Sequence, residues 1–428
     1  DYGATLGTNF IVVVNDNQMS IAENHGGIYA DLRLLRNTNG TAEPNLFRAM
    51  GYAYRYVHYG NDLKSLIEMF RAVKDIDHPV VVHLNTMKGM GLPVAEADKE
   101  TFHFAGPFDL KTGAPLHEEN PQTQPEGYDE VFAKGMLRRM KENDNVMVIT
   151  AGTPGVLGFD KARRSEAGRQ FIDVGIAEQA AVDVASGLAK GGMRPVVGFV
   201  SSFLQRAYDQ FSQDIALNRQ PATFVVFYGS MFSMNDETHL GFFDIALLSN
   251  IPNLLYLAPT CKEEFEAMLD WSVRQTEKAV VIRTPGSVAV SNPDVKVLDD
   301  YSKPEYEFVR EGGEVALIGE GPMFGIMAQA ADLLAKEGVD VTLINPRNLS
   351  TLDTAALDRL KDYHLVITAE DGILDGGFGQ KVASYLGDSS VRVINLGLPK
   401  EFLNRYDYSE LQHRCGLTPE QIAQTAKS

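Results

Sequence analysis

The sequence has 428 residues, of which 44% are hydrophobic and 22% are charged. This composition excludes a disordered or fibrous chain, and the length favours about three domains over one small module. There are 39 lysines and arginines against 57 aspartates and glutamates, so the net charge is −18. Because this field would repel nucleic acid and anionic membranes, we expect neither as a partner.

Cysteine usage and hydropathy exclude further classes. Cys261 and Cys415 are too far apart for a metal or redox motif, and no apolar run reaches the roughly 18 residues of a membrane-spanning helix. We therefore expect a cytoplasmic protein. The chain begins at Asp1, and residues 1–8 read like the end of an interrupted element, so we expect an N-terminal segment to be missing.

The first predicted domain covers residues 1–118 and alternates apolar strand runs with a helical run. Such alternation is typical of parallel sheets that are covered by helices on both faces. We expect strands at 10–14 and 79–84, a helix at 62–74 and a long ordered loop at 88–113. Long loops in compact domains often carry function.

A polar, proline-containing stretch at 119–126 is a predicted linker to a second domain at 127–288. This domain has four predicted strands, at 146–150, 195–200, 223–227 and 279–283. Helical runs lie between them, at 128–142, 176–190, 205–218 and 262–275. The regular alternation predicts a doubly wound sheet.

A second predicted linker, at 289–305, leads to a third domain at 306–428. Its strands are expected at 315–318, 341–344 and 365–368. The sequence therefore predicts an α/β protein of three doubly wound domains, the first of which is incomplete.

The turn Asn15–Ser20 follows the first predicted strand. Open α/β sheets bind ligands at the carboxyl ends of their strands, and amide and carbonyl oxygens are ligands that Mg²⁺ accepts. Asn17 and the carbonyl of Met19 are therefore candidate metal ligands, although an acidic ligand would have to come from elsewhere. From spacing alone, a polar turn between a strand and a helix is the commoner explanation of the same residues.

Other candidates follow in the second domain and in the long loop. Glu178 begins a helix of small residues and could exchange a proton with a bound heterocycle, or simply interact with the helix dipole. Phe203 and Arg206 could offer a ring face and a fixed cation to a flat ligand, or be an ordinary core residue and surface charge. His103 and His239 are proton carriers or surface histidines.

The order of these motifs resembles that of the thiamine-diphosphate enzymes of the transketolase superfamily, and specifically the 1-deoxy-D-xylulose-5-phosphate synthase family. The resemblance covers essentially the whole chain. The matching segments are residues 11–20, 86–91 with Ala95, Glu96 and His103, 173–179, 203–210, 238–244, and Glu370 with 376–379.

This resemblance implies three domains: the rear part of the diphosphate-binding domain, then the pyrimidine-binding domain, then the transketolase C-terminal domain. It also implies a homodimer with thiamine diphosphate and Mg²⁺ as cofactors. The cofactor ring would be bound by Glu178, Phe203 and Arg206. Its diphosphate and metal would be held by Asn17, Met19, Ser20 and Lys88.

The predicted catalytic residues are Glu178, as the acid that binds the aminopyrimidine, with His103 and His239 facing the substrate. The implied reaction is decarboxylation of pyruvate and condensation of the enamine with an aldehyde acceptor such as glyceraldehyde 3-phosphate. One alternative is a transketolase that moves a two-carbon ketol unit between sugar phosphates. Another, of a different class, is a noncatalytic fragment or partner subunit that lacks the metal aspartate and completes another polypeptide, with the missing N-terminal segment as its partner.

Several positions depart from the pattern of the synthases. The aspartate that supplies their acidic Mg²⁺ ligand would precede Asp1. Two arginines expected to hold the acceptor phosphate are replaced, because the chain has Tyr228–Ser230 and Pro285–Ser287 at those places. Asn235 stands where the synthases have an aspartate. Without the two guanidinium groups, bidentate recognition of a phosphate is lost, which puts glyceraldehyde 3-phosphate in question as the acceptor.

Overall fold

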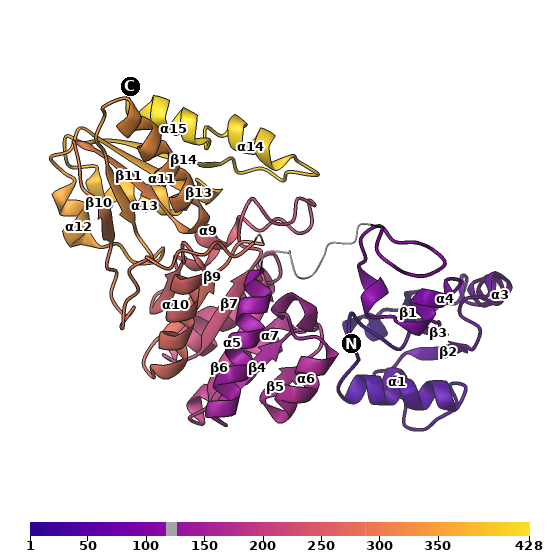
Figure 1. The fold of residues 1–428 in the computed structure, drawn as a ribbon. Coiled ribbons are helices and arrows are strands. Elements are labelled where there is room, and N and C mark those ends of the chain that lie inside the picture. The colour runs from indigo at the N-terminus through magenta and orange to yellow at the C-terminus, as the bar shows by residue number, and fades with distance from the viewer. Residues whose placement is uncertain (117–125, 287) are drawn as a thin grey trace. The chain divides into compact units, whose positions relative to one another are not determined.

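The computed structural model of the chain describes residues 1–116, 126–286 and 288–428 (Figure 1). These residues belong to two compact units. Unit 1 comprises residues 1–124 and 173–176, and unit 2 comprises residues 125–172 and 177–428. Residues 119–125 of the first predicted linker, and Ser287, lie outside the described residues.

Unit 1 contains a parallel three-stranded sheet in the order β1-β3-β2. The strands are β1 (Ile11–Asp16), β2 (Ala53–Val57) and β3 (Val80–Asn85), and the helices are α1 (Gly27–Asn37), α2 (Leu46–Ala49), α3 (Leu63–Val73) and α4 (Pro93–Ala97). The two predicted strands and the predicted helix are confirmed. The turn after β1 begins later than predicted, because Asn15 and Asp16 still pair with Leu84 and Asn85.

Unit 2 begins with a six-stranded sheet in the order β5-β4-β6-β7-β9-β8. Its strands are β4 (Val146–Thr150), β5 (Phe171–Asp173), β6 (Arg194–Val200), β7 (Thr223–Phe227), β8 (Leu254–Leu257) and β9 (Ala279–Arg283). Its helices are α5 (Tyr128–Glu142), α6 (Lys161–Ala167), α7 (Glu178–Lys190), α8 (Tyr208–Gln210), α9 (Asp244–Leu248) and α10 (Lys262–Arg274). All four predicted strands are confirmed, and the neighbours β4, β6, β7, β9 and β8 pair in parallel in that order.

The single helix predicted at 205–218 is wrong. The chain there forms a 3₁₀ turn at Leu204–Ala207, then α8, then a π-helix at Phe211–Leu217. Side chains from outside the π-helix bind its carbonyl groups: Ser186 Oγ donates to the carbonyl of Asp214 at 2.9 Å, and Asn218 Nδ2 donates to that of Gln213 at 2.9 Å. These bonds satisfy carbonyls that a widened helix leaves exposed, and π-turns of this kind often mark functional segments.

A five-stranded sheet follows in unit 2, in the order β10-β12-β11-β13-β14. Its strands are β10 (Glu307–Arg310), β11 (Val315–Gly319), β12 (Thr342–Asn345), β13 (Leu365–Ile373) and β14 (Arg392–Leu398). Its helices are α11 (Gly321–Lys336), α12 (Thr354–Arg359), α13 (Phe378–Leu386), α14 (Tyr408–Arg414) and α15 (Pro419–Ala426). The strands pair in parallel except β10, which is antiparallel to β12.

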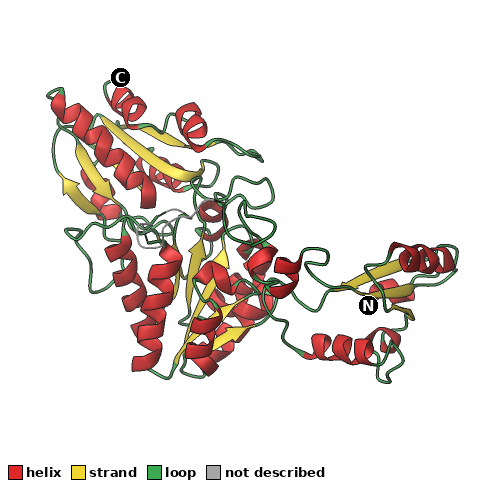
Figure 2. Ribbon diagram, turned by 45° about the vertical axis from the view of Figure 1, so that its right-hand side comes forward, coloured by secondary structure: helices red, strands yellow, loops and turns green. Residues whose placement is uncertain are grey.

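Helices cover the sheets of unit 2, as Figure 2 shows. One buried core lies between the six-stranded sheet and helices α5 and α10, and another between the five-stranded sheet and helices α11 and α15. The predicted α/β class with three sheets is therefore confirmed. No helix in the described part of the chain is both long enough and apolar enough to span a membrane.

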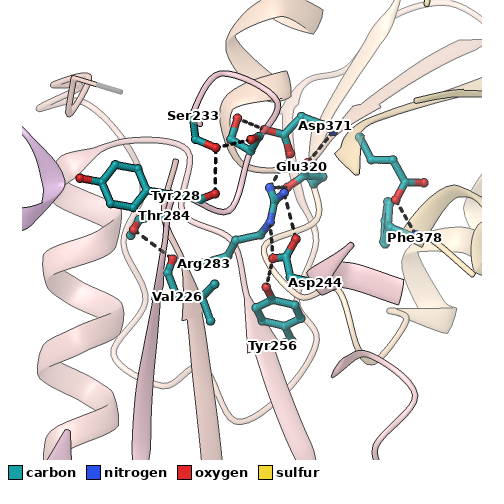
Figure 3. A network of polar contacts seen from close by, with 12 residues as sticks. Val226, Tyr228, Ser233, Asp244, Tyr256, Arg283, Thr284, Glu320, Asp371 and Phe378 are labelled. Atoms are coloured by element: carbon teal, nitrogen blue, oxygen red, sulfur yellow. Dashed lines mark hydrogen bonds and ion pairs between the residues drawn. The ribbon is translucent and has the colours of Figure 1, made fainter. Parts of the chain in front are cut away.

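Two buried arginines join the two sheets of unit 2. Arg283, at the end of β9, donates from Nε to Asp244 Oδ2 at 2.8 Å, forms an ion pair with Asp371 and donates to Glu320 Oε2 at 3.5 Å (Figure 3). In the reverse direction, Arg347 follows β12 and donates from Nε to Glu264 Oε1 of α10 at 2.7 Å. Each of the two sheets thus provides one arginine that binds a carboxyl group from the other sheet or its helices.

The network around Arg283 holds more carboxylates than cations. None of its four charged side chains is more than 1% exposed; these are Asp244, Arg283, Glu320 and Asp371. The hydroxyl of Tyr256, which is also buried, donates a hydrogen bond to Asp244. Burial, and then the charge of Asp371, raise the pKa of Glu320 well above its usual value. This shift favours the protonated form of Glu320, which adds no further negative charge beside Asp371.

A glutamine at position 320 tests this protonation. Because the pKa of Glu320 is higher in the folded chain than its usual value of 4.5, the stability that this group contributes is present at low pH and is lost as the pH rises. Glu320→Gln mimics the protonated acid. We expect it to leave Tm nearly unchanged at pH 4.5 and to raise it by about 3 °C at pH 8, measured by calorimetry.

The control is Glu314→Gln, which changes an exposed glutamate just before β11 and should give the same Tm as the native chain at both pH values. A Tm that is equally lowered at pH 4.5 and pH 8 in Glu320→Gln would show that Glu320 is ionised in the folded chain.

Candidate functional site

Glu178 is the first residue of α7 and is only 3% exposed. The small side chains of Ala181 and Ala185 are fully buried on the next turns of the helix, which lets α7 pack closely against its neighbours. Among the described residues, the carboxylate has one ion-pair partner, Arg206, at 4.0 Å. A buried carboxylate with so little direct compensation is unusual in a folded protein.

Phe203 and His239 lie in contact in the same unit. Their ring centroids are 5.5 Å apart and their planes make an angle of 62°. Phe203 immediately precedes the 3₁₀ turn that carries Arg206, and its carbonyl accepts the backbone N–H of Arg206 at 3.2 Å. The structure therefore brings together four predicted site residues: Glu178, Phe203, Arg206 and His239.

A short turn holds the ring of His239. Its Nδ1 lies 2.8 Å from Thr238 Oγ1 and 3.3 Å from Asp236 Oδ1, and its backbone N–H donates to the carbonyl of Asp236 at 2.9 Å. Hydrogen bonds from Thr238 and His239 lower the pKa of Asp236 to about 2. Asp236 was missed at the sequence level, although a carboxylate three residues before a histidine is a visible signal.

Unit 1 holds the second group of predicted residues, at the end of β1. The side-chain oxygen of Asn17 accepts the backbone N–H of Met19 at 3.1 Å. Lys88 Nζ donates to the carbonyl of Ser20 at 2.6 Å, so the long loop after β3 is fixed to this turn. Gln18, between the two candidate metal ligands, has a φ of 69°, a left-handed conformation that a non-glycine residue adopts only when its surroundings stabilise it.

His103 is associated with the same group. It ends a 3₁₀ turn at Thr101–His103, inside the loop predicted at 88–113. Burial, and then the charge of Lys88, lower the pKa of His103 below its usual 6.5. The imidazole is therefore neutral at pH 7 and able to accept a proton. The pKa of Lys88 is itself lowered, mainly by burial.

Asp16, next to Asn17, has a role that its place in the sequence did not reveal. Its carboxylate accepts the N–H of Gln18 at 3.1 Å, lies 3.0 Å from His83 Nε2 and forms an ion pair with Arg36. Burial alone would raise the pKa of Asp16, but the bonds from His83 and Arg36 hold it below the usual value. With both oxygens engaged, Asp16 supports the turn and does not serve as a free acidic ligand.

The donor set for a metal ion is consequently incomplete. In the ranges that the structure describes, no group of three or more histidine, cysteine, aspartate or glutamate side chains is arranged to hold a metal. The oxygens of Asn17 and Met19 are chemically suited to Mg²⁺ but supply only neutral ligands.

The segments that replace the expected arginines are closely packed. A Cβ on Gly286 would lie 2.2 Å from the ring of Tyr228, and one on Gly241 would lie 1.8 Å from the Tyr228 carbonyl oxygen. Ser230 is fully buried and its hydroxyl donates to Asp371. Tyr228 therefore fills the space beside Gly286 with an uncharged ring.

Known families match most of unit 2. The family model of the transketolase pyrimidine binding domain matches residues 127–289, and that of the transketolase C-terminal domain matches residues 305–422. The 1-deoxy-D-xylulose-5-phosphate synthase of Symbiobacterium thermophilum is 36% identical over 98% of this chain and 70% of the relative. That of Trichodesmium erythraeum is 34% identical over 97% of this chain and 72% of the relative. The chain belongs to the transketolase family.

Within the transketolase family, the chain is similar to the 1-deoxy-D-xylulose-5-phosphate synthases, and the pyrimidine-binding match implies thiamine diphosphate as the family cofactor. Two solved structures share the fold. One, described as a split gene transketolase in an inactive β4 tetramer, has a TM-score of 0.61 at 22% identity and covers 71% of this chain and 97% of its own. The other, transketolase from Pichia stipitis in complex with sedoheptulose-7-phosphate, has a TM-score of 0.60 at 14% identity, with 99% and 73% covered.

The electrostatic link between Lys88 and His103 can be tested in this transketolase-family chain. We expect Lys88→Met to raise the pKa of His103, because the repulsion between two cations is removed while the burial of the ring remains. The measurement is a titration of the His103 ring protons by NMR. Lys111→Met, which changes an exposed lysine of the same unit, should leave the titration unchanged. An unaltered His103 titration in Lys88→Met would contradict the assignment.

Proposed function

We propose that this chain carries the pyrimidine-side and part of the diphosphate-side machinery of a thiamine-diphosphate- and Mg²⁺-dependent transferase. It would decarboxylate pyruvate and join the remaining two-carbon unit to an aldehyde. The observation that supports this most is the buried carboxylate of Glu178 near Arg206, in the segment similar to pyrimidine-binding domains. The similarity to the 1-deoxy-D-xylulose-5-phosphate synthases supports the choice of reaction.

The residues of unit 2 fit a flat, basic heterocycle. Glu178 would hold a proton at a ring nitrogen of the aminopyrimidine, since a buried carboxyl group exchanges protons readily with a base of similar strength. Phe203 would stack on the ring, and Arg206 would keep the Glu178 carboxylate in place. When bound, thiamine diphosphate supplies the carbon nucleophile and the electron sink, so these side chains need only orient it and move protons.

The turn of unit 1 fits a diphosphate with its metal only in part. Asn17 Oδ1 and the Met19 carbonyl would be two of the Mg²⁺ ligands, and Lys88, held beside Ser20, would face the diphosphate. We propose that an acidic ligand comes from a residue outside this group, since Asp16 is engaged by His83 and Arg36. Mg²⁺ commonly takes its other ligands from phosphate oxygens and water.

His103 and His239 would handle the substrate protons. A neutral His103 at pH 7 suits a base, and His239, oriented by Asp236 and Thr238, suits a donor to a substrate oxygen. We further propose that the diphosphate-binding, pyrimidine-binding and C-terminal domains occupy 1–118, 127–288 and 306–428, and that the active protein is a homodimer.

A conservative change of Glu178 tests the assignment of the cofactor acid. Glu178→Gln retains the size of the side chain but cannot transfer the proton. We expect it to keep the far-ultraviolet circular dichroism spectrum of the native protein and to slow exchange of the thiazolium C2 proton of bound thiamine diphosphate by at least 100-fold, followed by NMR.

The matched control is Glu142→Gln, which alters an exposed glutamate at the end of α5 and should exchange at the native rate. If Glu178→Gln exchanges at that rate too, Glu178 is not the cofactor acid.

The replaced arginines make a prediction about the acceptor. Each charge-assisted hydrogen bond to a phosphate is worth about 1.5–3 kcal/mol, or tenfold and more in affinity. Tyr228 and Gly286 stand at these places, so we expect kcat/KM for glyceraldehyde 3-phosphate to be less than tenfold higher than kcat/KM for glyceraldehyde. The measurement is the release of labelled CO₂ from pyruvate by the assembled enzyme.

A preference for the phosphorylated aldehyde of more than 100-fold would mean that other cations hold the phosphate. Absence of CO₂ release with every aldehyde would contradict the proposed reaction, and cleavage of a ketose phosphate without CO₂ would indicate a transketolase instead.

A further inference from the structure

The loop that carries His239 is held by the C-terminal part of the chain. This loop, residues 228–243, leaves β7 and ends at α9; we call it the His239 loop. It contacts residues 399–408, which run from the end of β14 to the first residue of α14 and which we call the clamp segment. The Tyr406 hydroxyl donates to the carbonyl of Met231 at 2.9 Å, and the Tyr408 hydroxyl donates to that of Ser233.

Asn235 binds the clamp segment through both its backbone and its side chain. Its carbonyl accepts the N–H of Arg405 at 2.6 Å, and its amide Nδ2 donates to the carbonyl of Tyr406 at 2.8 Å. An aspartate at position 235 could not donate this bond and would set a carboxylate oxygen against a carbonyl oxygen. The asparagine that departs from the pattern of the synthases is therefore matched to the clamp segment.

Apolar contacts accompany these hydrogen bonds. The ring of Phe242 lies 6.4 Å from that of Tyr406, and the ring of Phe243 lies 5.9 Å from that of Phe402. Met231, Leu240 and Phe242 are buried in the core of the five-stranded sheet. The His239 loop thus follows a strand of the six-stranded sheet, but its buried side chains pack in the core of the five-stranded sheet.

We infer that Asn235, Tyr406 and Tyr408 are positioning residues that hold His239 at the substrate. The hydrogen-bonded anchors reach as far as Asn235, and the turn that orients His239 begins at the next residue, Asp236. The clamp segment therefore sets where the His239 ring meets Phe203. This inference rests on the proposed role of His239, and it gives the C-terminal domain a part in the active site.

Hydrogen–deuterium exchange on the 428-residue chain tests the clamp without reference to activity. Tyr406→Phe removes one hydrogen bond, and Asn235→Asp replaces a donor by a repelled acceptor. We expect backbone amides at 236–241 to exchange about fivefold faster in Tyr406→Phe, and faster still in Asn235→Asp. Tyr385→Phe is the control, because the Tyr385 hydroxyl donates a hydrogen bond to Asp358 and makes no hydrogen bond to the described residues of the His239 loop. Unchanged exchange at 236–241 in both variants would overturn the inference.

Kinetics of the assembled enzyme separate positioning from mere stability. The same variants should raise KM for the aldehyde about fivefold while Tm and the affinity for thiamine diphosphate stay at their native values. If faster exchange came with a lowered Tm and with weaker binding of both thiamine diphosphate and the aldehyde, these residues would have a structural role and the inferred positioning role would be overturned. Faster exchange with native kinetics would support the clamp and contradict the proposed role of His239.

Discussion

The interaction on which unit 2 depends is the insertion of Arg283 among three buried carboxyl groups (Figure 3). It connects two sheets that have separate cores, and two of its carboxyl groups, Asp371 and Asp244, lie at the two ends of the His239 loop. Near the start of the loop, Ser230 donates to Asp371, and just after its end, Asp244 receives Arg283. A charge that is expensive to bury is thereby compensated only when both sheets and the loop are in place.

In the predicted site, individual cations near the ligand, and not the net charge of the chain, would attract anionic substrates. A net charge of −18 would repel anionic substrates, so attraction must come from placed cations. Lys88 is held by the Ser20 carbonyl, and Arg206 approaches Glu178 at 4.0 Å. Each cation is positioned by its own unit. The uncharged ring of Tyr228 beside Gly286 supplies no cation where the synthase pattern has an arginine expected to bind phosphate.

Much of the fold could be predicted, because most buried strands are β-branched runs that resemble one another in composition. The strands at 146–150 and 223–227 were predicted to the residue. β8 was missed because Leu254–Leu257 lacks β-branched residues. The helix predicted at 205–218 contains a π-helix, one of whose carbonyl groups is bound by Ser186, 28 residues away in the sequence. Patterns along the chain carry no information about such contacts.

The sequence by itself determined the class of fold, the transketolase family and the identity of the candidate residues, because strand composition and motif order are properties of the chain alone. Only the tertiary structure decided that Asp16 is engaged by His83, which lies 67 residues away in the sequence. It also decided that tyrosines more than 160 residues away anchor the His239 loop. Burial, hydrogen-bond partners and pKa shifts arise from groups that meet in space, and their spacing in sequence does not encode them.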